Sequence, residues 1–346
     1  MNTDWMTFLQ SNTGKAYPTC AQAPALMTLP TRTSIQVMGA EAAVFLQAIL
    51  TQEILTSTPS GAVHAALCNA KGRTLGILQV HPVRIGPEQE YRLSVPTGLV
   101  PELIKTLKLY LLRRKVTVAL DSDWGFIGLI NPTLQHLNAL GLNTTHHRAL
   151  DQNITQDGII ATWEQRTEGS RVSVQGPINV LTQYWSRLSP NTEIVADWAW
   201  DHAEILDGIA RVTPETYLHF VPQWLNLDLK DGISFKKGCY PGQEVVARLH
   251  YLGKPNRRLL VGQCDRAGPL MPGTEIQLRD DPAMVAGEIV TSVAQNPKSG
   301  TGQIFLAVMR LKHVHDTLSI DGAPCTLHPS TLALDSQHED QEASTH

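Results

Sequence analysis

Cys239 lies in a short segment, SFKKGCYPGQE (Ser234–Glu244), whose composition suits neither a buried core nor an ordinary surface loop. Lys236 and Lys237 precede the cysteine, and Gly238 leaves a backbone N–H open to close approach. Nearby cations and backbone donors favour the thiolate form of a cysteine. The segment therefore indicates a reactive thiol at Cys239 with Lys237 beside it.

The same segment also allows a purely structural interpretation. Tyr240, Pro241 and Gly242 are typical of a tight turn, and the cysteine would then be a small filler. The sequence places no histidine beside Cys239 to act as a base, which argues against a cysteine nucleophile of the protease type. P-loop, GxGxxG, HExxH and GxSxG motifs are all absent, and the histidines form no convincing set of metal ligands.

The composition is that of a globular protein with more than one domain. The chain has 346 residues, of which 42% are apolar and 17% charged, and two or three domains are expected at this length. A net charge of −4 argues against a protein that mainly coats nucleic acid. Basic residues nevertheless cluster between Lys105 and Lys115 and between Lys230 and Arg258, which favours a small anionic ligand.

The five cysteines are scattered and include no CxxC pair, so their spacing encodes neither a zinc ribbon nor a ferredoxin-type cluster. We expect free thiols in a reducing cytoplasm. The N-terminal residues lack the pattern of a signal peptide and the arginines of a transit peptide. Prolines interrupt the uncharged stretch 16–31, which excludes a membrane helix there. These features predict a cytoplasmic protein without a membrane segment.

After a loose N-terminal segment, the hydrophobic pattern predicts an α+β unit of order β-α-β-β-β-α-β. The NAKG sequence of residues 69–72 predicts a hairpin turn inside it. Its strands are expected at 33–39, 61–68, 73–80, 90–96 and 115–120, and its helices at 40–50 and 101–112.

A second unit of similar order follows and is predicted as β-α-β-β-α-β, the split-βαβ order. Asn131 is the expected N-cap of its first helix, with Pro132 in the first turn, and 143–158 is the expected polar loop. The similarity of the two units suggests an ancient duplication. The strands of the second unit are expected at 125–130, 159–164, 171–176 and 192–196, and its helices at 131–140 and 178–188.

From Arg257 onward, short strands alternate with Gly, Pro and Asp turns, a pattern typical of a small antiparallel barrel or sandwich. The last twelve residues, 335–346, are polar and acidic, and we expect them to be disordered. The strands of the barrel are expected at 257–264, 274–278, 287–294, 303–310, 316–320 and 323–328.

The octapeptide KGCYPGQE (Lys237–Glu244) resembles the K-G-C-[FY]-x-G-Q-E signature of the YgfZ-type folate-binding proteins. These proteins are relatives of aminomethyltransferase, the T-protein of the glycine cleavage system. The resemblance extends from about Leu29 to Arg310. Its other landmarks are the stretches 220–228 and 246–259, CNAKGR at 68–73, and LLRRKVTV at 111–118.

This resemblance implies an α+β fold of two split-βαβ-like domains and a C-terminal antiparallel β-barrel, arranged around a central hole that binds tetrahydrofolate or another folate. The implied function is that of an accessory protein in the assembly or repair of iron–sulfur proteins. Through client proteins such as a radical tRNA-methylthiolating enzyme, it would support tRNA modification. The implied domains are 25–120 and 121–198 for the α+β parts, 199–256 for the segment that completes the cavity, and 257–334 for the barrel.

Candidate site residues follow from the signature and from the folate contacts of the family. Trp200 matches one of two family tryptophans, whereas the other position holds Arg32, whose guanidinium would stack on the ligand or pair with it. Trp200 is equally consistent with a core aromatic, and the amides Gln223 and Asn226 are consistent with either ligand recognition or the joining of loops. The catalytic candidates are Cys239 and Lys237, and the candidates for folate binding are Arg32, Trp200, Gln223, Asn226, Gly238, Tyr240, Gly242, Gln243 and Glu244.

Two other functions stay open from the sequence, which does not establish whether the chain is an enzyme. Direct tRNA binding is weakly supported, because the chain is acidic and has no RNA-binding motif or evident group of exposed aromatic residues. A folate-dependent aminomethyl or one-carbon transferase would need a carboxylate near the folate nitrogen. The carboxylates available for that role are Asp201, Glu204, Asp207 and Asp228.

Overall fold

The computed structural model describes residues 3–12, 14, 23–142, 150–296 and 301–328. The chain divides into two compact units. The first comprises residues 1–200, 212–222 and 227–247, and the second comprises 201–211, 223–226 and the chain from Arg248 on. The domain boundaries expected from the sequence stay predictions, and the tail at 335–346 lies outside the described residues.

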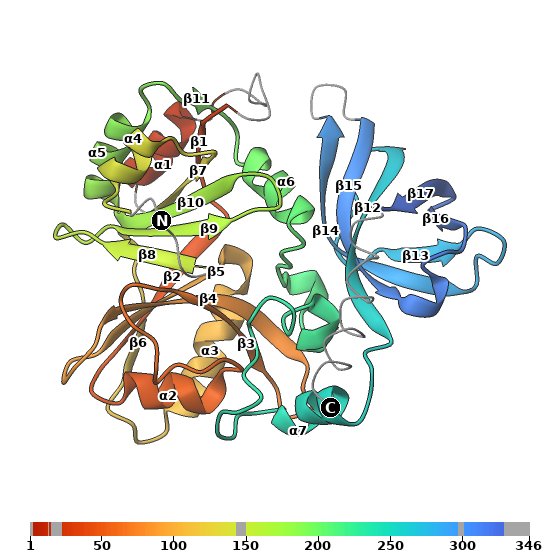
Figure 1. Ribbon diagram of the computed structural model, residues 1–346, viewed down its shortest axis with the longest axis horizontal. Coiled ribbons are helices and arrows are strands. Elements are labelled where there is room, and N and C mark those ends of the chain that lie inside the picture. Colours follow the sequence, from red (N-terminus) through yellow and green to blue (C-terminus); the bar gives the residue numbers. More distant parts are fainter. Residues whose placement is uncertain (1–2, 13, 15–22, 143–149, 297–300, 329–346) are drawn as a thin grey trace, which may run out of the picture. The chain divides into compact units, whose positions relative to one another are not determined.

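The first sheet forms from the β-α-β-β-β-α-β segment that the hydrophobic pattern predicts. All of its neighbouring strands are antiparallel. Helices α2 (Ala42–Ile49) and α3 (Val100–Leu111) lie beside this sheet (Figure 1). In spatial order its strands are β3 (Val63–Cys68), β4 (Thr74–Arg84), β5 (Glu90–Pro96), β2 (Arg32–Met38) and β6 (Thr117–Leu120).

The second sheet repeats this topology with one strand inserted. Strands β8, β9, β10 and β7 follow one another in space as β3, β4, β5 and β2 do in the first sheet. The N-terminal strand β1 pairs with β7 where β6 pairs with β2, and β11 is parallel to β1 at the edge. The order in space is β8 (Leu150–Ile154), β9 (Ile160–Gln165), β10 (Ser170–Pro177), β7 (Trp124–Ile130), β1 (Ala25–Thr28) and β11 (Glu193–Ile194).

Two predictions for the second sheet are wrong. Residues 150–154 form strand β8 and not part of a polar loop, and the signal was weak because the buried residue at the centre of this strand is Gln152. The N-terminal segment also contributes more than a loose tail, since all four residues of β1 are buried and α1 (Thr3–Ser11) precedes it.

The N-cap predicted for α4 (Leu134–Ala139) is also wrong. Asn131 has a φ of 50°, whereas an N-cap residue takes an extended conformation. Thr133 has that conformation, and its hydroxyl accepts the backbone N–H of His136 at 3.5 Å. The His136 ring accepts the Thr133 N–H at 3.0 Å in return, which completes a capping box.

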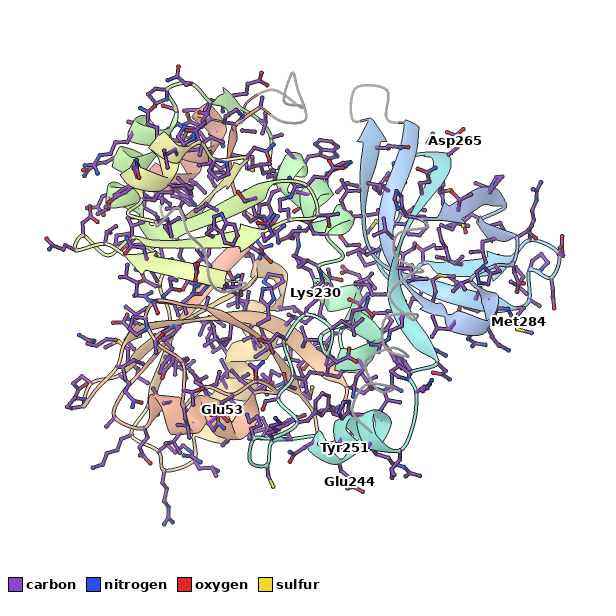
Figure 2. The ribbon with its side chains drawn as sticks, in the orientation of Figure 1. Glu53, Lys230, Glu244, Tyr251, Asp265 and Met284 are labelled. Atoms are coloured by element: carbon purple, nitrogen blue, oxygen red, sulfur yellow. The ribbon has the colours of Figure 1, made fainter. Side chains whose placement is uncertain are left out.

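The second unit contains the closed antiparallel barrel that the turn spacing predicts. Gly262 is required on its first strand, because a Cβ there would lie 2.4 Å from the Phe305 ring. Asp265 and Met284 are exposed on the outside of the barrel (Figure 2). The strands follow the order β12 (Arg257–Ala267), β15 (Thr301–Arg310), β14 (Val285–Asn296), β13 (Glu275–Leu278), β16 (Leu318–Ile320) and β17 (Ala323–Leu327).

Two helices lie between the second sheet and the barrel along the chain, α6 (Trp198–Leu206) and α7 (Gln243–Tyr251). The apolar pattern did not predict α6, whereas α7 begins inside the signature octapeptide. Within the described ranges, no helix is long and apolar enough to cross a membrane.

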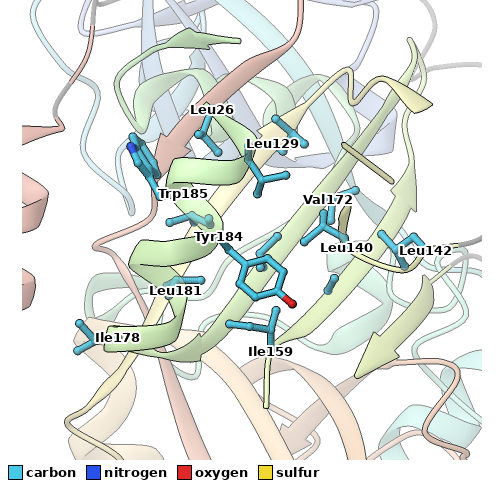
Figure 3. Packing of buried hydrophobic residues seen from close by; sticks show 14 of the residues in the cluster. Leu26, Leu129, Leu140, Leu142, Ile159, Val172, Ile178, Leu181, Tyr184 and Trp185 are labelled. Carbon is cyan, nitrogen blue, oxygen red and sulfur yellow. The ribbon is translucent and has the colours of Figure 1, made fainter. Parts of the chain in front are cut away.

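Helix α5 (Ile178–Leu188) covers the second sheet with one apolar face. Leu181, Tyr184 and Trp185 are buried at helical spacing, and they pack with residues of the sheet such as Leu129 and Val172 (Figure 3). Burial of each such side chain contributes about 1.5–3 kcal/mol of stability. Together these contacts hold α5 against the sheet.

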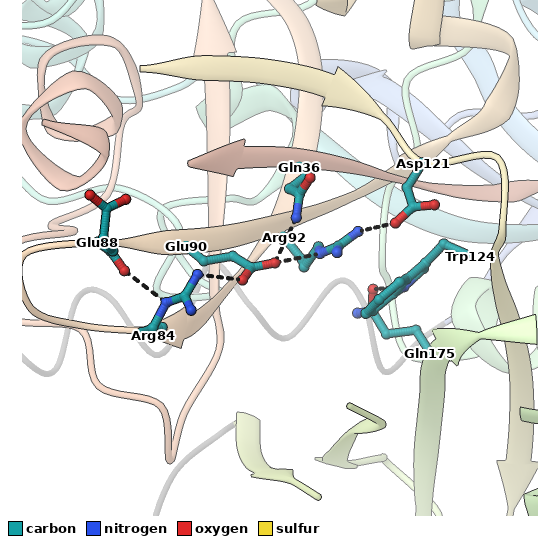
Figure 4. A network of polar contacts seen from close by, with 8 residues as sticks. All are labelled: Gln36, Arg84, Glu88, Glu90, Arg92, Asp121, Trp124 and Gln175. Carbon is teal, nitrogen blue, oxygen red and sulfur yellow. Dashed lines mark hydrogen bonds and ion pairs between the residues drawn. The ribbon is translucent and has the colours of Figure 1, made fainter. Parts of the chain in front are cut away.

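Polar side chains join the two sheets of the first unit. Arg92 of β5 donates to Asp121 at 3.0 Å, and its guanidinium lies 3.7 Å from the ring centroid of Trp124 on β7 (Figure 4). The Trp124 indole donates to the Gln175 side chain at 3.1 Å, and Gln175 donates to the Ser94 hydroxyl at 3.0 Å. A continuous chain of partners therefore crosses from one sheet to the other.

His81 of β4 completes this network and is held as the neutral ring. Gln152 donates its NH₂ to the Pro59 and Pro82 carbonyls, so its oxygen is the acceptor for His81 Nδ1–H at 2.8 Å. His81 Nε2 then accepts the Ser94 hydroxyl at 3.0 Å. Burial lowers the pKa of His81 to about 4, while the bond to Gln152 opposes this shift and nearby His64 adds to it.

We expect the free energy of unfolding to decrease as the pH falls from 6.5 to about 4. In that interval the unfolded chain binds a proton at His81 that the folded protein does not, so acid favours the unfolded chain. The pKa difference corresponds to about 3 kcal/mol. Urea unfolding followed by tryptophan fluorescence at pH 7 and at about pH 4.5 measures the loss.

The His81→Gln variant isolates the contribution of this ring. Its unfolding free energy should change by about 3 kcal/mol less than that of the wild type over the same interval. His219→Gln, at an exposed histidine, should retain the wild-type dependence. An equal pH dependence in His81→Gln and wild type would show that His81 does not control acid stability.

Candidate functional site

The signature segment belongs to the first compact unit and exposes its cysteine. Gly238 and Cys239 are exposed, whereas Lys237 and Tyr240 on either side of them are buried. No heavy atom lies within 4 Å of a Cβ built at Gly238, so the backbone before the thiol is open. The segment therefore presents a thiol between two buried anchors.

The first anchor is the ammonium group of Lys237, which lies at the C-terminal end of α2. It donates to the carbonyls of Gln47 at 2.6 Å and Gln52 at 3.1 Å, and also to that of Leu50. Gln47 lies in the last turn of α2, where carbonyls lack helical partners, and the helix dipole favours a cation there. Burial lowers the pKa of Lys237 to about 8 against the influence of Glu53, so the group is still mostly protonated near neutral pH.

The second anchor is Tyr240, whose ring centroid lies 5.2 Å from the Lys237 ammonium. Burial, with a smaller influence from Cys68, raises the pKa of the Tyr240 phenol. The side chain therefore stays neutral in its buried position next to the exposed cysteine in the chain.

A close backbone contact fixes the end of the turn. Gly242 has a φ of 81°, and a Cβ there would lie 2.4 Å from the carbonyl oxygen of Asn69. Gly72 has a φ of 70°, and its Cβ would lie 2.9 Å from that of Val245. The NAKG hairpin and the PG turn are far apart in the sequence. They can approach this closely only because residues 72 and 242 are both glycine.

An apolar cluster holds the flanking segments on the first sheet. Ala66 and Cys68 of β3 pack with Leu227, Ile233 and Val246 of the segments before and after the signature. Val246 is fully buried on α7, and this contact sets the direction in which α7 leaves the loop.

Accessibility separates Cys239 from the other described cysteines. All four are free thiols, and Cys68, Cys264 and Cys325 are buried. Burial raises the pKa of Cys68 and of Cys325 to about 12, so these thiols stay protonated. Cys20 lies outside the described residues.

Trp200 packs against the second sheet. Its side chain is 3% exposed. A Cβ at Gly128 would lie 2.5 Å from its ring, and the guanidinium of Arg171 lies 5.0 Å from the ring centroid. Arg171 also donates to Glu164 at 2.8 Å. The core alternative for Trp200 is consistent with this packing.

Two predicted folate contacts belong to the second compact unit. The Asn226 amide donates to the Leu259 carbonyl at 2.8 Å and accepts the Leu259 N–H at 3.4 Å. The Gln223 carbonyl accepts a bond from Arg258 at 2.8 Å. Asn226 thus joins its loop to strand β12, the second of the two roles that its sequence context allows.

The remaining predicted residues lie on the first unit. Gln243 and Glu244 open helix α7, where Glu244 is exposed (Figure 2). Arg32 begins β2 opposite Pro96, and its side chain is partly buried. The structure brings the signature residues together, and the roles of all predicted site residues in binding or catalysis stay predictions.

An ion-pair group that the sequence analysis missed occupies two of the candidate carboxylates. Arg211 lies against Asp201 and binds Glu204 at 2.6 Å. Glu204 is 4% exposed, and both carboxylates raise the pKa of Arg211 against the influence of burial. Across the described ranges, no group of three or more His, Cys, Asp or Glu side chains could hold a metal ion.

Two relatives of the chain carry the same protein name. The chain is 31% identical over 252 residues to the tRNA-modifying protein YgfZ of Colwellia psychrerythraea, an alignment that covers 71% of this chain and 74% of that protein. It is 27% identical over 317 residues to the tRNA-modifying protein YgfZ of Shigella boydii serotype 4, which covers 87% and 93%. No protein-family model matches the chain.

The fold is similar to that of a solved aminomethyltransferase. The glycine cleavage system aminomethyltransferase T from Bartonella henselae aligns with a TM-score of 0.66 over 95% of this chain and 96% of that chain. Sequence identity in this alignment is 14%, so the likeness concerns the fold alone. The prediction of a mixed α+β fold with a C-terminal antiparallel barrel is confirmed.

We expect Lys237→Met to lower the free energy of unfolding by about 2–3 kcal/mol, because it removes a charged donor from buried carbonyls. The neighbouring Lys236→Met is the matched control, since Lys236 is exposed, and it should change stability by less than about 0.5 kcal/mol. Urea unfolding measures both values. Equal stabilities of the two variants would show that Lys237 does not anchor the signature segment.

Proposed function

Because this chain belongs to the YgfZ family, we propose that it is a folate-binding accessory protein that assists the assembly or repair of iron–sulfur proteins. Its contribution to tRNA modification, methylthiolation in particular, then passes through client enzymes that carry such clusters. Its relatives are named tRNA-modifying proteins. The four described cysteines are free thiols, which suits work in the reducing cytoplasm.

The observation that carries the proposal is the exposed thiol of Cys239 on an anchored backbone. Lys237 and Tyr240 are buried on either side of it, so the loop is positioned before any client arrives. A thiol that contacts a client protein must be accessible, and Cys239 alone among the described cysteines meets this condition. Cys239 is therefore the proposed point of contact with the client.

The residues present fit a folate only in part. Lys71 is exposed on the hairpin, and a cation there suits the carboxylates of a folate tail. Trp200 is 3% exposed, so its ring has no face open for stacking on a ligand. The Asn226 amide is already hydrogen-bonded to the backbone of Leu259. When bound, tetrahydrofolate would supply one-carbon chemistry, and the chain would supply its binding site.

A folate-dependent aminomethyl transferase is the second candidate, and the aminomethyltransferase-like fold favours it. Two of its four candidate carboxylates, Asp201 and Glu204, are held by Arg211. Turnover of an aminomethyl donor by the purified protein would decide in favour of this candidate.

We expect Cys239→Ala to abolish support of tRNA methylthiolation, because the variant lacks the accessible thiol. The readout is the fraction of methylthiolated nucleoside in tRNA, measured by mass spectrometry in cells whose own copy of the gene is replaced by the variant. Unfolding of the purified variant should stay within about 0.5 kcal/mol of wild type, since the side chain is exposed.

Lys236→Gln is the control, because it changes an exposed neighbour and leaves the thiol in place. It should retain most of the methylthiolation. Full methylthiolation with Cys239→Ala would remove the thiol from the proposed function, whatever the folate experiment shows.

Titration of tetrahydrofolate into the purified protein tests the cofactor. We expect saturable quenching of tryptophan fluorescence. Quenching should be weaker in Trp200→Phe, because a ligand bound nearby can change the emission of a buried indole without stacking on it. Trp185→Phe is the control, since Trp185 is buried in the core of α5 and is not a candidate for binding. Absence of saturable quenching in folded wild-type protein would contradict the folate assignment.

A further inference from the structure

The C-terminal end of α7 exposes an aromatic ring. Tyr251 is the last residue of this helix and its side chain is 65% exposed, and Leu252 after it is 82% exposed (Figure 2). Tyr251 is the only Phe, Trp or Tyr among the described residues whose side chain is exposed. The helix thus ends with an exposed aromatic ring and an exposed leucine beside it.

The ring of Tyr251 is supported by its neighbour. The His250 ring lies 4.7 Å away, centroid to centroid, at an interplanar angle of 72°. This edge-to-face contact holds one ring upright beside the other. Both residues are exposed.

The chain around these rings is mainly basic, although Glu244 is exposed on the same helix four residues before Arg248. Between residues 245 and 264 the sequence contains no Asp or Glu. Arg248 and Lys254 are exposed, and the guanidinium of Arg257 lies 4.6 Å from the ring centroid of Trp224. Arg258 does not add to this surface, because it is buried against the Gln223 carbonyl. We call residues 248–257 together with Trp224 the α7 turn surface.

We propose that the α7 turn surface binds RNA, with unpaired bases stacked on Tyr251 and His250 and phosphates at Arg248 and Lys254. Bases of single-stranded loops stack on aromatic side chains, and nearby cations neutralise the backbone. An acidic protein partner would match the charges but would not require a projecting ring pair. The proposal is independent of folate and of Cys239. It takes up the direct tRNA binding that the sequence supports only weakly.

A second basic surface serves as the internal comparison. Lys105 and Lys108 on α3 are exposed, as are Leu109 and Leu112, which are 73% and 89% exposed. This α3 surface carries charge and apolar area without an exposed aromatic ring. Non-specific attraction of a polyanion would act at both surfaces, whereas base stacking would act only at the α7 turn surface.

The test is the binding of fluorescently labelled, unfractionated tRNA to the full chain, followed by anisotropy between about 50 and 200 mM salt. We expect Tyr251→Ala to weaken binding roughly tenfold, as the loss of one stacked base would. Arg248→Gln should weaken binding and lower the slope of log affinity against log salt by about one. Both side chains are exposed, so the variants should fold as wild type does.

The control variant Lys105→Gln/Lys108→Gln on the α3 surface should bind tRNA as wild type does. The proposal is overturned if tRNA does not bind saturably, if Tyr251→Ala binds unchanged, or if the α3 variant loses as much affinity as the α7 variants. Cys239→Ala should bind tRNA normally. Failure of the folate or thiol experiments therefore leaves this result unaffected, and the reverse also holds.

Discussion

The buried ammonium group of Lys237 is the contact on which the candidate site depends. It satisfies carbonyls at the end of α2 and so fixes the peptide that leads into Cys239. The Lys237 side chain is buried and the following glycine adds no Cβ, so the Cys239 thiol is exposed. The glycine contact between residues 72 and 242 then closes the turn on the first sheet. A reactive group needs this kind of fixed support to meet a partner in one geometry.

The two sheets of the first unit are linked by the path of the chain and by polar contacts. Strand β1 takes the position in the second sheet that β6 has in the first, so the N-terminal segment belongs to the later repeat. His81, Ser94, Gln152 and Gln175 then connect the sheets through buried hydrogen bonds in which donors and acceptors alternate. A satisfied network of this kind favours one relative position of the sheets, since any other would leave buried groups without partners.

Helix α7 relates the two proposals along the chain. It starts within the signature octapeptide and ends at Tyr251. Val246, near its start, is fully buried and sets the direction of the helix. In the proposed function, the chain would contact a client enzyme that modifies tRNA, and the proposed RNA surface would add a contact with the RNA itself. The exposed thiol suits the first contact, and the exposed ring with its cations suits the second.

The sequence alone determined the local elements and the family signature. Strand β5 and helix α5 have the bounds that their periodicity predicts, and every barrel strand was anticipated, because these patterns depend on neighbouring residues. Only the tertiary structure decided which of the adjacent Lys236 and Lys237 is buried and that Asn226 is bonded to Leu259. The same holds for β1 and β8. Their assignments depend on partners far away in the chain, and no local pattern contains that information.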